Sequence, residues 1–142
     1  MNKQQRMIET TYYRFNNLNP KGKFIGDCVI RAIANATNQK WEQTLRELTE
    51  CAIKMGDVAS DRKTFNKYLE QKGFIKMPMP KKPDGTKYEI WEWMDKNPSK
   101  IKEYEIVISI ANHLTCIKNG KIEDIWNCAR GKKMGNYWLK RK

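Results

Sequence analysis

Apolar side chains in the first half of the chain recur with the spacing of amphipathic helices. The clearest run alternates steps of four and three residues before Gly56: Trp41, Leu45, Leu48, Ala52 and Met55. This spacing places the apolar side chains on one helix face, and Gly56 is a typical C-terminal stop. We therefore expect an amphipathic helix over residues 41–55.

A shorter and more uniformly apolar helical pattern begins at Gly26-Asp27-Cys28. A helix with little polar surface is typical of the centre of a domain, so we expect this one to be buried. The side chain of Asp27 is placed to cap its N-terminus.

Two more helices are predicted before the β-rich part of the chain. The first carries Phe65, Tyr68 and Leu69 and ends at Gly73, and the second carries Ile90, Trp91 and Met94. Thr86 and Glu89 have the spacing of a capping box for the second helix, and Asn97-Pro98 ends it.

From residue 105 onward the pattern becomes that of β-strands. Residues 105–110 are mostly β-branched, and residues 113–118 and 121–126 flank Asn119-Gly120, a preferred pair for a type I′ hairpin turn. Shorter strands are expected within 74–79 and 136–139. Helices followed by an antiparallel sheet predict an α+β fold, with a helical N-terminal half and a C-terminal sheet.

The length of 142 residues fits one domain, so we assign residues 1–142 to a single unit with an irregular arm over 1–18. No apolar run approaches the ~20 residues of a membrane span. The polar N-terminus lacks the apolar stretch of a secretory signal. We therefore expect a cytoplasmic protein that does not bind membranes.

The net charge is strongly positive. Lys and Arg outnumber Asp and Glu by 28 to 16, which gives a formal net charge of +12. Much of the excess lies in a basic C-terminal tail over residues 130–142, which contains no acidic residue. Such a tail attracts acidic protein surfaces or nucleic acid. The alternative is a solvated end that only keeps the protein soluble. Tyr137 and Trp138 either stack on bases or dock the tail on the core.

The four cysteines are Cys28, Cys51, Cys116 and Cys128. A cytoplasmic location argues against disulfides. Zinc is not expected either, because no Cys-x-x-Cys pair occurs, and His113 and Cys116 lie three apart on a strand and point to opposite faces. We therefore expect no metal and no cofactor.

Cys28 is the candidate nucleophile. It opens a helix, and the partial positive charge and free N–H groups of a helix N-terminus favour a thiolate. The nearby Gly26 permits close approach of a substrate. The alternative is a buried structural cysteine at the start of a core helix.

His113 is the single histidine, so any imidazole base must be this residue. With Asn119-Gly120 as the turn, the hairpin register places His113 on the same face as Asp124 and Trp126. A carboxylate beside the ring would fix its tautomer and stabilise the imidazolium. A slip of one residue would bring Asn127 into the place of Asp124.

This order of residues resembles the papain-like cysteine peptidases. In that family a Cys, a His and an Asn or Asp follow one another, and a Trp two residues past the third member often shields it. The stretch Gly-Asp-Cys-Val-Ile-Arg-Ala, residues 26–32, is similar to small C39-like members from bacteria and their phages. The resemblance covers roughly residues 19–127. It implies a papain-like fold, a triad of Cys28, His113 and Asp124, a shielding Trp126, and a host-cytoplasmic location if a phage encodes the protein.

One position departs from the papain pattern. That pattern has a Gln six residues before the Cys, which donates to the oxyanion, whereas this chain has Gly22 there. Asn17 or Asn19 is the candidate replacement donor, and the alternative is that both only form turns. Without a second donor, turnover would fall by about 10²–10³.

Three functions follow from these features. The first is a cysteine hydrolase or transferase, of peptidase, isopeptidase or deamidase type, that forms an acyl-enzyme and acts on a protein or peptide with an acidic surface. The second is a weak or inactive papain-like protein that binds and blocks a host protein through an exposed patch of Trp91, Trp93 or Trp138. The third is nucleic-acid binding by the basic ends. The oligomeric state stays open.

Overall fold

The protein has an α+β fold, in which most helices precede most strands along the chain. The computed structural model describes residues 2–142. Its helices are α1 (Lys3–Arg6), α2 (Cys28–Thr37), α3 (Trp41–Met55), α4 (Arg62–Gln71), α5 (Ile90–Lys96) and α6 (Pro98–Glu103). Its strands are β1 (Tyr13–Phe15), β2 (Ile75–Met77), β3 (Tyr104–Ile110), β4 (His113–Lys118), β5 (Lys121–Asp124) and β6 (Tyr137–Arg141).

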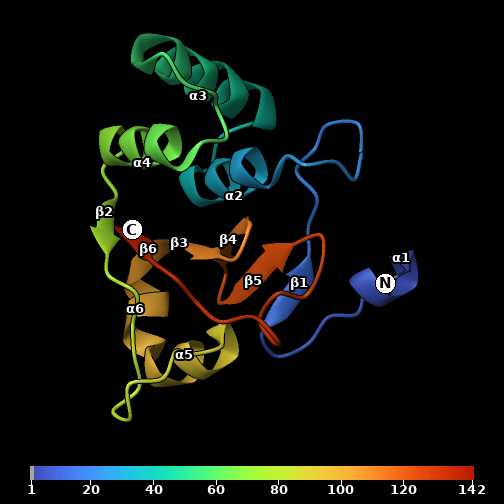
Figure 1. Ribbon diagram of the computed structural model, residues 1–142. Coiled ribbons are helices and arrows are strands. Elements are labelled where there is room, and N and C mark those ends of the chain that lie inside the picture. Colours follow the sequence, from blue (N-terminus) through green and yellow to red (C-terminus); the bar gives the residue numbers. More distant parts are fainter. Residues whose placement is uncertain (1) are drawn as a thin grey trace.

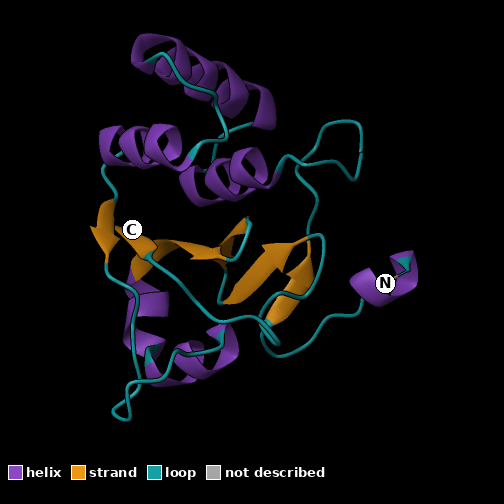
Figure 2. Ribbon diagram, viewed as in Figure 1, coloured by secondary structure: helices purple, strands orange, loops and turns teal. Residues whose placement is uncertain are grey.

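A six-stranded sheet lies between two groups of helices. Helices α2, α3 and α4 lie on one side of the sheet, and α5 and α6 lie on the other (Figures 1 and 2). The strand order is β1-β5-β4-β3-β6-β2, so β3 and β4 occupy the middle. No helix within residues 2–142 is long and apolar enough to cross a membrane.

The sheet is mixed, and the expectation of a purely antiparallel sheet is wrong at one edge. All neighbouring strands are antiparallel except β1 and β5, which run parallel. Within residues 2–18, expected to be an irregular arm, the chain forms α1 and β1. Strand β1 has only three residues, too few for a period-2 pattern to reveal it.

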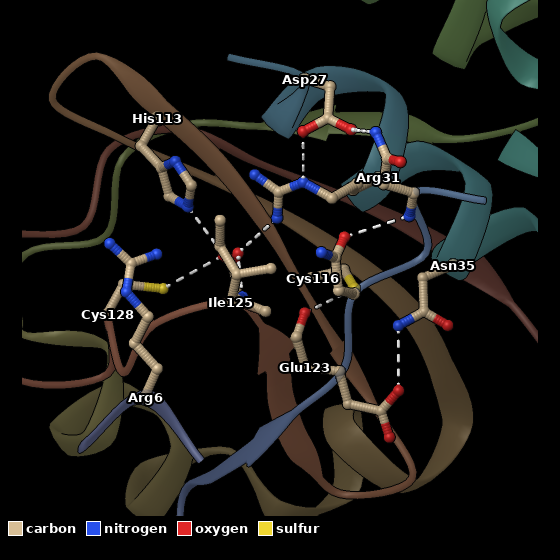
Figure 3. Close-up of polar contacts among 12 residues, drawn as sticks. Arg6, Asp27, Arg31, Asn35, His113, Cys116, Glu123, Ile125 and Cys128 are labelled. Atoms are coloured by element: carbon tan, nitrogen blue, oxygen red, sulfur yellow. Dashed lines mark hydrogen bonds and ion pairs between the residues drawn. The ribbon is translucent and has the colours of Figure 1, made fainter. Parts of the chain in front are cut away.

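The buried carboxylate of Glu123 fastens this edge. It accepts hydrogen bonds from Arg14 Nη1 and Asn16 Nδ2 at 3.0 Å each, which hold β1 and the residue that follows it. It also accepts one from Asn35 Nδ2 of α2 at 3.0 Å (Figure 3). One side chain of β5 therefore joins β1 and α2.

Each face of the sheet packs against its own helices to form a separate core. On β3, Ile106 and Ile108 belong to the cluster that contains Trp93 of α5, whereas Val107 belongs to the cluster with α2, α3 and α4. Side chains alternate between the two faces of a strand, so a strand covered on both sides needs apolar residues at every position. This requirement explains the consecutive apolar residues 106–108 in the middle of β3.

Several predicted elements are confirmed. Helix α3 spans the predicted residues and ends at Gly56, which has a left-handed φ of 68°. The hairpin has the predicted turn, because Asn119 and Gly120 both have positive φ and Lys118 pairs with Lys121. Helix α2 is buried and central, as its apolar pattern indicates.

The capping predictions for two helices are wrong. Helix α5 begins after Glu89, whose N–H donates to Glu92 Oε1, while Thr86 donates instead to Asp84 Oδ1 in the preceding turn. Asp27 precedes α2, but its side chain makes no capping hydrogen bond. The side chains of Thr86 and Asp27 hydrogen-bond to other side chains instead of to the end of a helix. The capping pattern alone does not predict these partners.

The C-terminal part of the basic tail over residues 130–142 is a strand of the sheet, β6. Strand β6 lies between β3 and β2, and Trp138 is 0% exposed, with its Nε1 donating to Asn66 Oδ1 at 2.9 Å. Tyr137 is buried as well. Of the two possibilities for these rings, docking on the core is confirmed and stacking on bases is wrong.

The same burial removes most of the expected exposed aromatic patch. Trp93 and Trp138 are both inside the protein. Trp91 is half-buried and lies under Arg130, whose guanidinium carbon is 4.8 Å from the ring centroid.

We predict that Trp138→Ala lowers the free energy of unfolding by about 3–5 kcal/mol, because it empties a fully buried site. Ile75→Ala, on neighbouring β2, should change it by little, because Ile75 is 68% exposed. Urea unfolding followed by tryptophan fluorescence and circular dichroism measures both. Equal losses in the two variants would contradict the docking of β6 on the core.

Candidate active site

Cys28 is the first residue of α2 and lines a pocket between this helix and the sheet. The pocket has a volume of about 330 Å³, and His113 and Asn112 line its other side. The Cys28 side chain is partly exposed, whereas Cys51, Cys116 and Cys128 are buried. Cys28 is therefore the one cysteine of the chain that a substrate can reach.

His113 and Asp124 are in direct contact at neighbouring strand ends. His113 Nε2 lies 2.7 Å from Asp124 Oδ2. The other carboxylate oxygen, Oδ1, accepts hydrogen bonds from Arg31 Nη1 at 2.8 Å and from the Ile125 N–H at 2.7 Å. In Figure 3 the side chains of His113 and Arg31 point toward the same region beside Ile125. The antiparallel hairpin register produces this contact, as the turn residues predict.

Trp126 and Asn127 occupy different places around the histidine. The rings of His113 and Trp126 are 5.1 Å apart between centroids and inclined by 52°, so the indole covers part of the imidazole. Asn127 Oδ1 instead accepts from the N–H of Ala129 at 3.1 Å. Of the two alternatives for the third residue, Asp124 is the one that contacts His113.

The surroundings of Cys28 favour its thiolate. Burial by itself would raise the pKa of the thiol, but hydrogen bonds from His113 and from the Leu114 backbone, together with the charge of His113, lower it. Nε2 of His113 faces Asp124, which leaves Nδ1 as the nitrogen available to the sulfur.

The surroundings of His113 favour the imidazolium. Burial would lower its pKa, but the hydrogen bond to Asp124 and those to two nearby thiols outweigh burial and raise it. A lowered thiol pKa beside a raised imidazole pKa favours the state in which His113 carries the proton and the sulfur is a thiolate.

Arg31 and Asp27 extend this arrangement into the helix. Arg31 is 5% exposed and bridges the two acids, with Nε 2.7 Å from Asp27 Oδ1 and Nη1 on Asp124. Asp27 Oδ2 in turn accepts from Asn19 Nδ2 at 3.1 Å and Trp41 Nε1 at 2.9 Å. Arg31 is a residue of the site that was not predicted from the sequence. The four-residue spacing of Asp27 and Arg31 on one helix was the available signal.

The two candidate oxyanion donors are engaged within their own loop. Asn19 is buried, its amide nitrogen donates to Asp27, and its Oδ1 accepts from the N–H groups of Lys21 and Lys23. Asn17 Nδ2 donates to the Lys23 carbonyl at 3.0 Å. Neither asparagine lines the Cys28 pocket. Their geometry matches the turn-forming alternative, because the loop provides acceptors nearer than the pocket.

His113, Asp124 and Cys128 also bring three potential metal-ligand atoms within 4.8 Å of one another. A metal would require a deprotonated Cys128 and an unprotonated His113 nitrogen. Burial raises the pKa of Cys128 to about 11. Arg31 also already neutralises Asp124. The donor set therefore fits a hydrogen-bonded cluster better than a metal site.

Comparisons with models of protein families, with curated proteins and with solved structures found no match to this chain. The site is accordingly interpreted from its own geometry.

We predict that iodoacetamide alkylates Cys28 rapidly at pH 6, because its lowered pKa preserves the thiolate below the free-thiol value of about 8.5. His113→Ala should slow this labelling at pH 6 and shift its rise to higher pH. Peptide mass spectrometry gives the rate at each cysteine, and the buried Cys116 and Cys128 serve as internal references. A labelling rate of Cys28 that rises only near pH 8.5 and does not change in His113→Ala would contradict the Cys28–His113 ion pair.

A second prediction concerns Asp124. Because His113 is the single histidine, its carbon-bound ring protons give unambiguous NMR signals whose pH dependence reports its pKa. Asp124→Asn removes the carboxylate that favours the imidazolium, so the His113 pKa should fall toward about 6.5. Asn127→Ser is the matched control and should leave the titration unchanged. A variant pKa as high as that of the parent would show that Asp124 does not hold the proton on His113.

Proposed function

We propose that the protein is a cysteine hydrolase or acyl transferase with a papain-like core, in which Cys28, His113 and Asp124 form the catalytic triad. One observation about His113 carries this proposal. His113 is hydrogen-bonded to Asp124 at 2.7 Å, and it lines the same pocket as the accessible Cys28. The order Cys, His, Asp and the helical half before the sheet are further similarities to that family.

In the proposed reaction the Cys28 thiolate attacks the carbonyl carbon of an amide or thioester, and the carbonyl π electrons move to oxygen. The tetrahedral intermediate collapses, the bond to the leaving group breaks, and the His113 imidazolium protonates the leaving amine or thiolate. The neutral His113 then takes a proton from water, or from an acceptor amine, as this nucleophile attacks the acyl-enzyme. Release of the carboxylic acid or new amide restores the thiolate and the imidazolium.

The N-terminus of α2 supports the oxyanion in this proposal. As the first residue of the helix, Cys28 has an N–H with no carbonyl partner one turn earlier. The helix dipole adds a partial positive charge at the same point. Asn112 also lines the pocket, and its side-chain amide is the second donor in this proposal.

The role of Asp124 in this proposal is to position His113. Arg31 holds one carboxylate oxygen, so the other is directed at Nε2 and fixes the tautomer that presents Nδ1 to the sulfur. Trp126 covers the ring and limits water around this contact.

A second candidate function, binding and blocking of another protein, is favoured by a different surface. A hollow of about 1140 Å³ lies between residues 18–21 and α3, and its apolar lining includes Leu18, Trp41, Leu45 and Ile53. Binding there would persist in Cys28→Ala, which separates this function from catalysis. Nucleic-acid binding now rests on charge alone, because the rings expected to stack on bases are buried.

We predict that the protein cleaves members of a random peptide mixture, with products identified by mass spectrometry, and that Cys28→Ala abolishes the cleavage. Activity should fall at acid pH as the Cys28 thiolate gains a proton, and at alkaline pH as the raised pKa of His113 is passed. Cys51→Ala, which alters a buried cysteine away from the pocket, is the control for removal of a thiol. Cleavage that persists in Cys28→Ala would exclude Cys28 as the nucleophile.

A further inference from the structure

A second hollow adjoins the pocket that contains Cys28 and His113. It has a volume of about 560 Å³. Arg62 and Ser109 line both hollows, so the two are adjacent. We call it the basic pocket, because its lining includes no acidic residue and four basic ones: Arg62, Lys87, Lys132 and Lys133.

These positive charges are largely uncompensated. Within residues 2–142, none of the four side chains forms an ion pair. The pKa of Glu89 is lowered by the Gly131 N–H and also by the charge of Lys133, so Lys133 alone is partly balanced. All four side chains are exposed to solvent and are available to a ligand.

The floor of the basic pocket is tightly built. Ser109 Oγ donates to the Asn136 carbonyl at 2.8 Å, and the Gly135 N–H donates to the Ser109 carbonyl at 2.8 Å. A Cβ at Gly135 would lie only 2.8 Å from Ser109 Oγ, so only glycine permits this approach. These contacts hold the loop that carries Lys132 and Lys133 against β3. The backbone of this loop therefore needs little further ordering when a ligand binds.

The charges in the two hollows fit an extended anionic substrate, because the basic side chains lie beside the nucleophile and not around it. The proposed nucleophile is itself negative, and it would repel an anionic group brought directly against it. Cations placed beside the reacting centre draw such a group to one side of it and raise the rate of encounter. Within the linings of the two hollows no acidic side chain opposes this effect.

We propose that the basic pocket binds an acidic side chain of the substrate close to the bond that Cys28 attacks, so that the enzyme selects acidic segments of peptides and proteins. This inference rests on the proposed function, because it assigns a substrate class to the same site.

The first test compares alkylation of Cys28 by anionic iodoacetate and by neutral iodoacetamide. In the double variant Lys132→Gln with Lys133→Gln, the ratio of the iodoacetate rate to the iodoacetamide rate should fall by about 3–10-fold at low ionic strength. High salt should shrink this difference. Lys54→Gln with Lys102→Gln removes the same charge from exposed positions on α3 and α6, and it should leave the ratio unchanged.

The second test uses the random peptide mixture. Asp and Glu should be enriched on one side of the cleaved bond in the parent, and this enrichment should be lost in the Lys132 and Lys133 double variant but retained in the Lys54 and Lys102 control. If no peptide is cleaved, the alkylation ratio alone decides the inference.

The outcomes separate the two proposals. Suppose that iodoacetamide labelling is fast and depends on His113, but the ratio of the iodoacetate rate to the iodoacetamide rate is unchanged in the Lys132 and Lys133 variant. This result would overturn the acidic-substrate inference and leave the proposed function intact. Slow labelling that ignores His113→Ala would overturn the proposed function and this inference with it. Fast, His113-dependent labelling together with a ratio that falls only in the Lys132 and Lys133 variant supports both.

Discussion

The buried carboxylate of Asp124 is the interaction on which the arrangement of this protein depends. It is 2% exposed and lies where the end of β5, the start of β4 and helix α2 meet. Taking a carboxylate and a guanidinium out of water costs several kcal/mol per ion, which only close, well-oriented partners offset. Arg31 and His113 are those partners, so the carboxylate holds the helix that begins with Cys28 at a defined position over the strand that begins with His113.

This constraint produces a chain of alternating charge through the site. Asp27, Arg31 and Asp124 alternate in charge, and the shifted pKa values of His113 and Cys28 favour an imidazolium and a thiolate that continue this alternation. Each charge is stabilised by its neighbours, so the same contacts that position α2 also bias the proton from sulfur to imidazole. Structural and proposed catalytic roles therefore reside in one network.

The residues that surround this network come from strands that are far apart in the sequence. The sequence pattern of the basic C-terminal stretch predicts a charged tail, yet β6 is an internal strand between β3 and β2, because Trp138 fills the core beside α4 and donates to Asn66. The residues just before β6 carry Lys132 and Lys133 to the edge of the Cys28 pocket. The net charge alone predicts an anionic partner, whereas only the position of β6 shows which cations line the hollow that adjoins the Cys28 pocket.

Interactions over short distances in sequence were determined by the sequence itself. The period of apolar residues and Gly56 define α3, and Asn119-Gly120 sets the hairpin register that brings His113 to Asp124. Interactions between distant segments were decided by the tertiary structure. Examples are the parallel addition of β1 to β5 and the insertion of Arg31 between two acids. The reason is physical: periodicity and turn preference report only the local backbone, while a buried polar group takes its partner from whichever segment packs against it.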